Sequence, residues 1–195
     1  MNKNRCSWCG EDPLYMQYHD KEWGVPVYKD DKLFEFLILE TFQAGLSWIT
    51  VLRKRENFKK VFDHFDYQKI AKYNDEKFGE LIQDTGIIRN KLKIKATISN
   101  AIAFMEVQKE FGSFSKYIWG FVDYKPIENS WKSLDEIPSK TELSNKISID
   151  LKKRGFKFVG STIIYAHMQA TGMVNDHVVD CFRFKEVQKS GFHSK

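Results

Sequence analysis

The sequence predicts an all-α fold, and three observations support this class. Apolar residues recur at three- and four-residue spacing along most of the chain, which is typical of helices. No stretch alternates strictly enough between apolar and polar residues to predict a strand. Gly, Pro, Asp or Ser bound each periodic segment, as they commonly do at helix ends. The 195 residues, 42% of them hydrophobic, suffice for one compact domain with a substantial core.

The periodic segments can be followed in order. Asp30 or Asp31 can cap the first clear helix, which should end at Gly45. Its apolar positions have helical spacing: Leu33, Phe34, Leu37, Ile38 and Phe42. Ser47 can cap the next helix. Further helices are predicted at about 75–83, 89–109, 114–121, 142–153 and 162–171. The polar stretch 125–140 is expected to be a long surface loop within the domain.

Candidate metal ligands lie at the two ends of the chain. Cys6, Cys9 and His19 are near the start, and His177 and Cys181 are near the finish. The last two are four residues apart, so on a helix they would project from one face. One thiolate and one imidazole from each end would make the closed tetrahedral set that structural Zn²⁺ favours. Two alternatives stay open: the Cys6 and Cys9 pair could form the N-terminal half-site, or all five could simply be small buried residues.

Composition narrows the class of protein further. The net charge of +5 suits a nucleic-acid partner without requiring one. The three cysteines cannot all pair, and no apolar N-terminal run marks a secretory signal, so we expect a protein of the reducing cytoplasm. The longest apolar runs are too short to cross a membrane, so no membrane partner is expected.

One predicted turn has the form of a DNA-contacting hairpin. Residues 80–91 read as a helix, a short turn containing Gly86, and the start of a second helix with Lys91, Lys93 and Lys95 in its first turns. Such a turn can present backbone N–H groups and a helix N-terminus to a phosphate, with lysines adding charge. The alternative is an ordinary connection between helices whose lysines face solvent.

Aromatic residues and one carboxylate form a second candidate site. The first fifty residues are rich in large aromatic residues, among them Trp8, Tyr15, Tyr18, Trp23 and Trp48. Glu40 lies on a helix that is otherwise apolar around it, and burying an unpaired carboxylate is costly. The aromatic residues could stack on a flat, electron-poor ring while Glu40 accepts hydrogen bonds from its edge. Alternatively, the aromatic residues are core and Glu40 faces solvent.

Several long sequence words carry a family resemblance. They are DPLY (12–15), YHDKEWGVP (18–26), QAGLSWITVLRKR (43–55), KKRGFKFVG (152–160) and VNDH (174–177). They closely resemble the 3-methyladenine DNA glycosylase I family, and the similarity runs from about residue 6 to residue 181. This resemblance implies a helix-hairpin-helix fold in which a zinc site joins the two ends of the chain.

The resemblance also assigns roles to particular residues. The family's zinc ligands match Cys6, His19, His177 and Cys181, which leaves Cys9 as a bystander. Its base pocket falls on Tyr18, Glu40 and Trp48, surrounded by Trp8, Tyr15 and Trp23.

The remaining assignments concern DNA and domain organisation. Gly45 and Leu46 match the family's loop that enters the DNA stack. The whole chain, 1–195, would be one glycosylase unit. Residues 30–120 would form its helix-hairpin-helix core, with 1–29 and 121–195 forming the zinc-joined part.

Two departures from the wider superfamily are informative. Ile88 stands where the usual hairpin has a second glycine, so phosphate contact there should be altered. Residues 89–116 contain no Asp, whereas the superfamily commonly has a catalytic Asp beyond the hairpin. The 3-methyladenine family itself lacks this Asp. Methylation at N3 makes the purine cationic and a good leaving group, so extrusion, electrostatic stabilisation and access of water could suffice.

The sequence therefore predicts a monofunctional DNA repair glycosylase. Its expected substrate is double-stranded DNA containing N3-alkylated adenine, its product is free 3-methyladenine, its zinc is structural, and it acts as a monomer. Glu40 is the candidate catalytic residue, and could act on the sugar, activate water or only hold the base. Two alternatives are a non-enzymatic zinc-stapled DNA-binding module and a zinc hydrolase, which would need an open coordination position.

Overall fold

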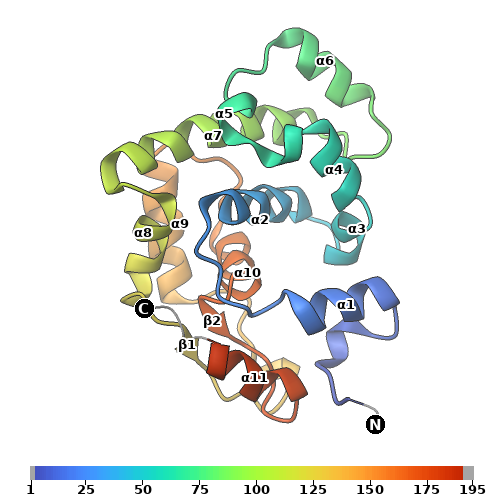
Figure 1. The fold of residues 1–195 in the computed structure, drawn as a ribbon, viewed down its shortest axis with the longest axis vertical. Helices are drawn as coiled ribbons and strands as arrows, with labels where there is room; N and C mark the ends of the chain where they lie inside the picture. Colours follow the sequence, from blue (N-terminus) through green and yellow to red (C-terminus); the bar gives the residue numbers. More distant parts are fainter. Residues whose placement is uncertain (1–2, 191–195) are drawn as a thin grey trace.

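The structure is a computed structural model that describes residues 3–190, and these residues are mostly helical, as predicted. Helix α2 lies at the centre, between α7 and α10 (Figure 1). Along the chain the helices are α1 (Pro13–Lys21), α2 (Asp30–Gln43), α3 (Trp48–Leu52), α4 (Arg55–Val61), α5 (Tyr67–Ile70), α6 (Asp75–Gln83), α7 (Lys91–Phe111), α8 (Phe114–Trp119), α9 (Glu142–Lys153), α10 (Ser161–Ala170) and α11 (Phe182–Ser190). Short 3₁₀ turns are η1 (Ser7–Cys9), η2 (Asp63–Phe65), η3 (Gly120–Val122) and η4 (Leu134–Glu136).

Two differences from the predicted helices stand out. The segment after Ser47 is two helices, α3 and α4, separated by a turn at 53–54. Helices α1, α5 and α11 were not predicted, although α1 has a strong local start signal. Its N-cap Asp12 accepts hydrogen bonds from the N–H groups of Leu14 and Tyr15, and Pro13 occupies its first position.

Two very short strands also depart from the prediction of no strands. Strand β1 (Ile127–Glu128) pairs in parallel with β2 (Val174–Asn175). A two-residue strand is too short to show alternation in the sequence. The pairing matters because it fastens the loop 125–140 beside the segment that carries His177.

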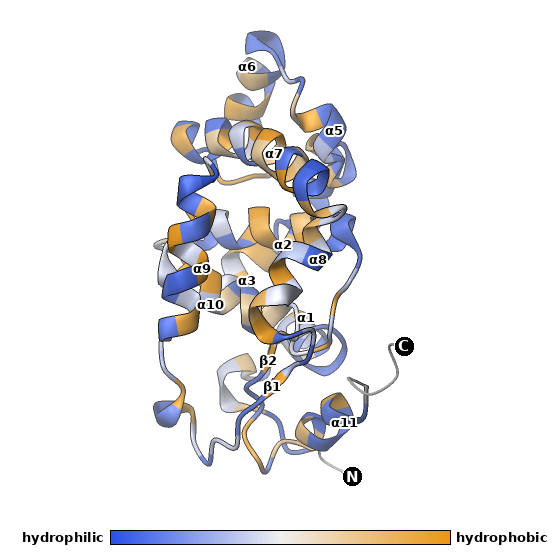
Figure 2. Ribbon diagram, turned by 90° about the vertical axis from the view of Figure 1, so that its left-hand side faces the viewer, coloured by the Kyte–Doolittle hydropathy of each residue, from blue (hydrophilic) through white to orange (hydrophobic). Residues whose placement is uncertain are grey.

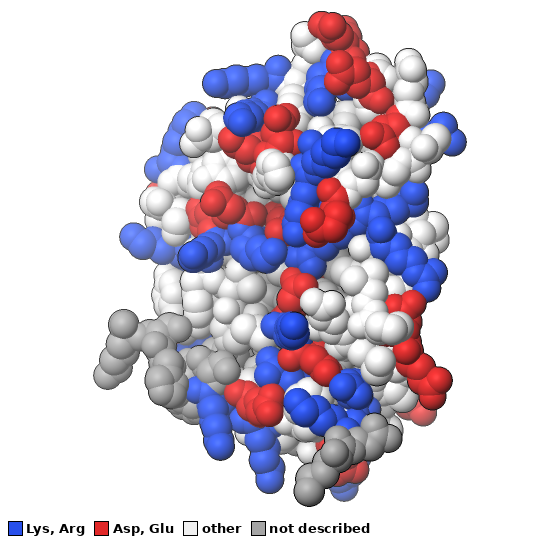
Figure 3. Space-filling view, turned by 45° about the vertical axis from the view of Figure 1, so that its right-hand side comes forward, with Lys and Arg blue, Asp and Glu red and all other residues white. Residues whose placement is uncertain are grey.

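The central helix is mainly hydrophobic, whereas the outer helices carry both hydrophobic and hydrophilic residues. Figure 2 shows hydrophobic residues concentrated along the central α2, whereas hydrophobic and hydrophilic residues alternate along the outer helices α6 and α9. On the face shown in Figure 3, basic and acidic side chains are intermixed. Within residues 3–190, no helix is both long enough and apolar enough to cross a membrane.

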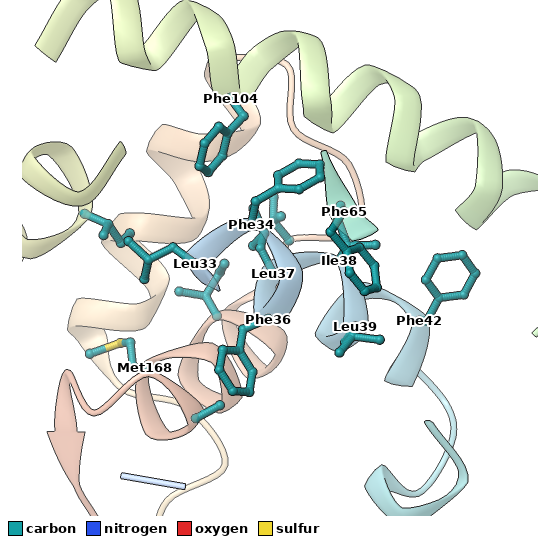
Figure 4. Close-up of a cluster of buried hydrophobic side chains, with 14 of the residues drawn as sticks. Leu33, Phe34, Phe36, Leu37, Ile38, Leu39, Phe42, Phe65, Phe104 and Met168 are labelled. Atoms are coloured by element: carbon teal, nitrogen blue, oxygen red, sulfur yellow. The ribbon is translucent and has the colours of Figure 1, made fainter. Parts of the chain in front are cut away.

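Helix α2 is buried on nearly every side. All ten residues from 33 to 42 are buried. The hydrophobic side chains among them radiate towards α7, where Phe104 lies, and towards α10, where Met168 lies (Figure 4). Such a helix cannot place a polar side chain in solvent at these positions. The carboxyl group of Glu40 is therefore carried into the interior by the helix itself.

The expected cap of α2 serves another helix. Lys29 is the N-cap of α2 and makes no side-chain capping bond. The Asp30 carboxylate instead accepts hydrogen bonds from the N–H groups of Phe114 and Ser115, at 2.9 and 2.8 Å, and from the Gln108 amide at 2.6 Å. Asp30 thus ties the start of α2 to the start of α8, where N–H groups lack intrahelical partners.

Lys93 fastens α7 to the end of α2. The residue is 5% exposed, and its ammonium group donates to the carbonyl oxygens of Phe42 (2.8 Å) and Ala44 (2.6 Å), which lie at the C-terminus of α2. Burial lowers the pKa of Lys93. This arrangement corrects the expectation that the Lys93 ammonium contacts DNA, because the group is already used inside the fold.

We expect Lys93→Ala to lower the free energy of unfolding by about 1.5–3 kcal/mol, since charge-assisted hydrogen bonds to two carbonyl oxygens are lost. Lys91, two residues away, is exposed and provides the matched control. Lys91→Ala should change stability by no more than about 0.5 kcal/mol. Denaturant unfolding measures both, and equal effects of the two substitutions would contradict this role for Lys93.

Candidate active site and metal centre

The structure brings four candidate metal ligands together from the two ends of the chain. Cys6 precedes η1, His19 lies on α1, His177 follows β2, and Cys181 directly precedes α11. All four are buried, and one ligand atom from each lies within 4.8 Å of the others. This buried group of two thiols and two imidazoles could hold a metal ion.

The spacing of the four groups fits a single tetrahedral ion. Bonds of about 2.3 Å to sulfur and about 2.0–2.1 Å to nitrogen place S and N roughly 3.5 Å apart on a tetrahedron. The Cys181 Sγ lies 3.4 Å from His19 Nε2 and 3.5 Å from His177 Nδ1, and the Cys6 Sγ lies 3.6 Å from His177 Nδ1. The donor set therefore matches a soft or borderline divalent ion.

Surrounding groups orient both imidazoles. The Asp20 carboxylate lies 2.8 Å from His19 Nδ1 and accepts two hydrogen bonds of 2.8 Å from Arg5. Burial opposes ionisation of Asp20, but the hydrogen bonds from Arg5 and His19 outweigh it and lower its pKa to about 2. The Trp23 carbonyl oxygen lies 3.1 Å from His177 Nε2. Such contacts orient each ring so that its other nitrogen points toward the two cysteine sulfurs, as a metal ligand would.

Cys9 lies outside this group. Its buried thiol donates to the carbonyl oxygen of Cys6 at 3.2 Å. The four ligand atoms that converge do not include its sulfur. The arrangement thus favours the ligand set implied by the family resemblance over a half-site formed by Cys6 and Cys9.

A cavity of about 350 Å³ adjoins the cluster. The six residues predicted to form a base pocket all line it: Trp8, Tyr15, Tyr18, Trp23, Glu40 and Trp48. Sequence reasoning missed six further lining residues: Gln43, Leu134, Ile137, Pro138, Ala166 and Gln169. Three of these belong to the stretch 125–140, so part of the expected surface loop is a pocket wall.

The aromatic rings form a connected set around this cavity. The Trp8 ring centroid lies 4.9 Å from that of Tyr15 and 5.0 Å from that of Trp23, both in edge-to-face contact. The rings of Tyr18 and Trp48 are 5.3 Å apart. These ring contacts hold the aromatic side chains of the cavity wall in place.

Glu40 is a buried acid without a partner. Its side chain is 2% exposed, and its Oε2 atom has no hydrogen-bond partner among residues 3–190. Burial raises its pKa to about 8. The indole N–H groups of Trp8 and Trp48 are likewise buried without acceptors. An unpaired carboxyl group and two unpaired indole N–H groups beside an aromatic cavity are typical of a binding site for a planar ligand with polar edges.

Comparisons with known proteins agree with this geometry. The sequence pattern that defines the methyladenine glycosylase family matches residues 8–184. The chain belongs to this family.

Individual relatives are similar over nearly their full length. DNA-3-methyladenine glycosylase 1 of Escherichia coli (strain K12) is 51% identical over 177 residues, 91% of this chain and 95% of the relative. A crystal structure of 3-methyladenine DNA glycosylase I superposes with a TM-score of 0.90 at 52% identity, covering 92% of this chain and 98% of that one. The Staphylococcus aureus structure described as the structural basis of 3-methyladenine recognition has a TM-score of 0.90 at 30% identity and covers 99% of both chains.

In this member of the methyladenine glycosylase family the cluster of two cysteines and two histidines supports the pocket wall directly. The His19 ring centroid lies 5.3 Å from that of Trp8, and the His177 ring centroid lies 4.6 Å from that of Trp23. Helix α1 supplies His19 to the cluster and the adjacent Tyr18 to the cavity. The cluster and the cavity are therefore two sides of one packed unit.

Asp176 is a site residue that sequence reasoning did not single out. It is fully buried, and its carboxylate accepts four hydrogen bonds of 2.7–2.8 Å from Asn129, Trp131, Tyr165 and Gln169. These donors come from the 125–140 loop and from α10, which both line the cavity. Asp176 belongs to the motif VNDH (174–177), directly before the candidate ligand His177.

The expected DNA-contacting residues lie near the cavity rim and in the α6–α7 turn. Gly45 and Leu46 are exposed between Gln43 and Trp48, which both line the cavity. The N–H of Gly86 already donates to the Asp84 carboxylate at 2.6 Å, and a Cβ at Gly86 would overlap the Asn57 amide.

We expect Glu40→Gln to raise the thermal midpoint of the free protein at pH 8 and to leave it nearly unchanged at pH 4.5. An unfolded Glu ionises near pH 4.5 and the buried one near pH 8, so wild-type stability falls as pH rises through this interval. The effect is at most roughly 5 kcal/mol, at about 1.36 kcal/mol per pH unit. Thermal melts across this range measure it. If wild type and variant show the same pH dependence, Glu40 is not a neutral acid in the free pocket.

Proposed function

We propose that this protein is a monofunctional DNA glycosylase that removes 3-methyladenine from alkylated DNA. The observation that carries the proposal is the unpartnered carboxyl group of Glu40 within an aromatic cavity. A cationic, planar base is complementary to such a site. Its positive charge and edge N–H groups can pair with the carboxyl group, and its ring face can stack on the aromatic side chains. The names of relatives at 49–51% identity support the same activity.

The pocket residues would divide the work of base recognition. Trp48 and Tyr18 offer ring faces for stacking, and Glu40 accepts hydrogen bonds from the base edge. A cationic base beside Glu40 lowers the pKa that burial has raised to about 8. Base binding and ionisation of Glu40 therefore favour each other. Recognition becomes selective for a charged purine because a neutral one would leave a buried carboxylate uncompensated.

The reaction requires little acid chemistry from the protein. A cationic purine is already a good leaving group, so the enzyme must extrude it, stabilise positive charge that develops on the sugar, and admit water. An ionised Glu40 would supply negative charge to the site in which that state forms. We therefore assign Glu40 chiefly to binding and electrostatic stabilisation of the cationic base.

We propose that the metal is zinc and that its role is structural. Four protein ligands at tetrahedral spacing complete the coordination of zinc, whereas a catalytic zinc keeps one position for water. This donor set argues against the zinc hydrolase alternative. When bound, the ion would supply a cross-link between the two ends of the chain. A protein that only bound the DNA backbone would not need the unpartnered carboxyl group of Glu40, so this group also argues against the non-enzymatic alternative.

We further propose that α6 and α7 are the hairpin helices of a helix-hairpin-helix core within residues 30–120, with 1–29 and 121–195 forming the metal-joined part. Residues of both parts line the cavity, which supports catalysis where they meet. Gly45, Leu46, the Gly86 turn and Lys91 would face double-stranded DNA, with Leu46 filling the space left by the extruded base. All groups of the site come from one chain, which supports action as a monomer.

The direct test of the activity is release of base from duplex DNA methylated at adenine N3. The wild-type protein should liberate free 3-methyladenine and leave an abasic strand, because hydrolysis of the glycosidic bond does not cut the backbone. Chromatography of the released base and alkaline cleavage of the strand measure the two products. Tight binding to this DNA without released base would instead identify the non-enzymatic DNA-binding module.

The metal assignment predicts contrasting effects for two neighbouring positions. His19→Ala should lower the zinc content of the purified protein and its thermal midpoint, because structural zinc binding is coupled to folding. Cys9→Ser should retain the metal, since the Cys9 sulfur lies outside the cluster. Elemental analysis and thermal melts measure both. Zinc retained without His19 and lost without Cys9 would refute this ligand set.

A further inference from the structure

A groove outside the base pocket lies between α7 and the segment that leads into α10. Its volume is about 490 Å³, and its lining residues are Leu92, Lys95, Ala96, Ser99, Lys157 and Phe158. Leu92 is 69% exposed and Phe158 is 37% exposed, which is unusual for large apolar side chains. Within residues 3–190, neither Lys95 nor Lys157 forms an ion pair. The Lys95 ammonium lies 5.3 Å from the centroid of the Phe78 ring. The groove thus combines exposed apolar surface with two cations that have no carboxylate partner in the described part of the chain.

The fold holds this surface in a defined shape. The fully buried Asn100 side chain accepts the N–H of Lys157 at 2.8 Å and donates to its carbonyl oxygen at 3.1 Å. The Ser148 hydroxyl donates to the carbonyl oxygen of Val159 at 2.6 Å. Between these two anchors Phe158 has φ +56°, a left-handed conformation that is rare for an aromatic residue. The chain therefore presents the Phe158 ring outward at a conformational cost.

The groove is continuous with the expected DNA face. Lys93 bonds to the carbonyl oxygen of Ala44, so the first turn of α7 lies against the segment that carries Gly45 and Leu46. Leu92 lies on that same turn, directly before Lys93, and Lys95 begins the next turn. From the cavity rim the surface thus runs across the start of α7 to Lys157 and Phe158.

We propose that this groove is a second DNA-contacting surface, which extends the interface beyond the hairpin turn. Lys95 and Lys157 pair with backbone phosphates, while Phe158 and Leu92 pack against deoxyribose. Positive charge favours DNA as the occupant over an apolar protein partner, since two desolvated lysines facing an apolar surface would be costly. The inference rests on the proposed DNA glycosylase function but concerns a surface that the base pocket does not include.

Removal of both charges tests the proposal. In the Lys95→Ala/Lys157→Ala protein, affinity for undamaged duplex should fall roughly tenfold or more. The slope of log affinity against log salt concentration should flatten by about 0.9 for each lost contact, roughly 1.8 for the pair. The matched control is Lys109→Ala/Lys146→Ala. Both control lysines are exposed, and Lys109 lies on the same helix about 20 Å from Lys95. The control should keep the wild-type slope.

A second variant separates DNA contact from a structural role. Phe158→Gly removes the ring and relieves the left-handed backbone, so the thermal midpoint should stay at or near the wild-type value while DNA affinity falls. Free 3-methyladenine should bind all these variants as it binds wild type, which distinguishes failure of the groove from failure of the base pocket. A wild-type salt slope in the lysine variant, with unchanged DNA affinity in Phe158→Gly, would overturn the proposal.

Discussion

The packing of two cluster histidines against two pocket tryptophans is the contact on which the site depends. His19 and His177 come from opposite ends of the chain, and their rings contact Trp8 and Trp23. Any ion held by the four-residue cluster therefore fixes the cavity wall as well as the chain ends. This coupling gives a structural metal a consequence for recognition, because a displaced indole would remove a ring face from the cavity.

The buried carboxyl group of Glu40 shows how the pocket favours a charged ligand. Helix α2 is buried along ten consecutive residues, so Glu40 has no route to solvent and its pKa rises to about 8. In the free protein the buried carboxyl group has no partner, which is unfavourable. A cationic base would offset this unfavourable free energy on binding. Asp176 provides the contrast, since its carboxylate is equally buried but accepts four hydrogen bonds. One acid organises the wall, while the other remains available to a ligand.

The sequence predicted the helical class, the residues of the cluster and the six residues that line one side of the cavity, because these depend on local spacing and on long sequence words. It missed what depends on distant contacts. A polar loop became a pocket wall through β1–β2 pairing and the Asp176 hydrogen bonds. Lys93 lies among other lysines at the start of a helix and is expected on the surface. Hydrophobic periodicity cannot predict that its ammonium group reaches the carbonyl oxygen of Phe42. Asp30 has the position of a cap for α2, but the backbone N–H groups that it accepts from lie more than eighty residues away.

Calorimetric titration with free 3-methyladenine tests most directly whether this cavity recognises the base. Trp48→Ala should weaken binding by about 1–3 kcal/mol, the usual worth of stacking a base on an aromatic ring. Glu40→Gln should also weaken it, because the amide keeps the shape of the side chain but loses its charge and half of its acceptor capacity. Both variants must be folded and metal-loaded for the comparison. Wild-type affinity in both would place the base-binding site elsewhere and contradict the account.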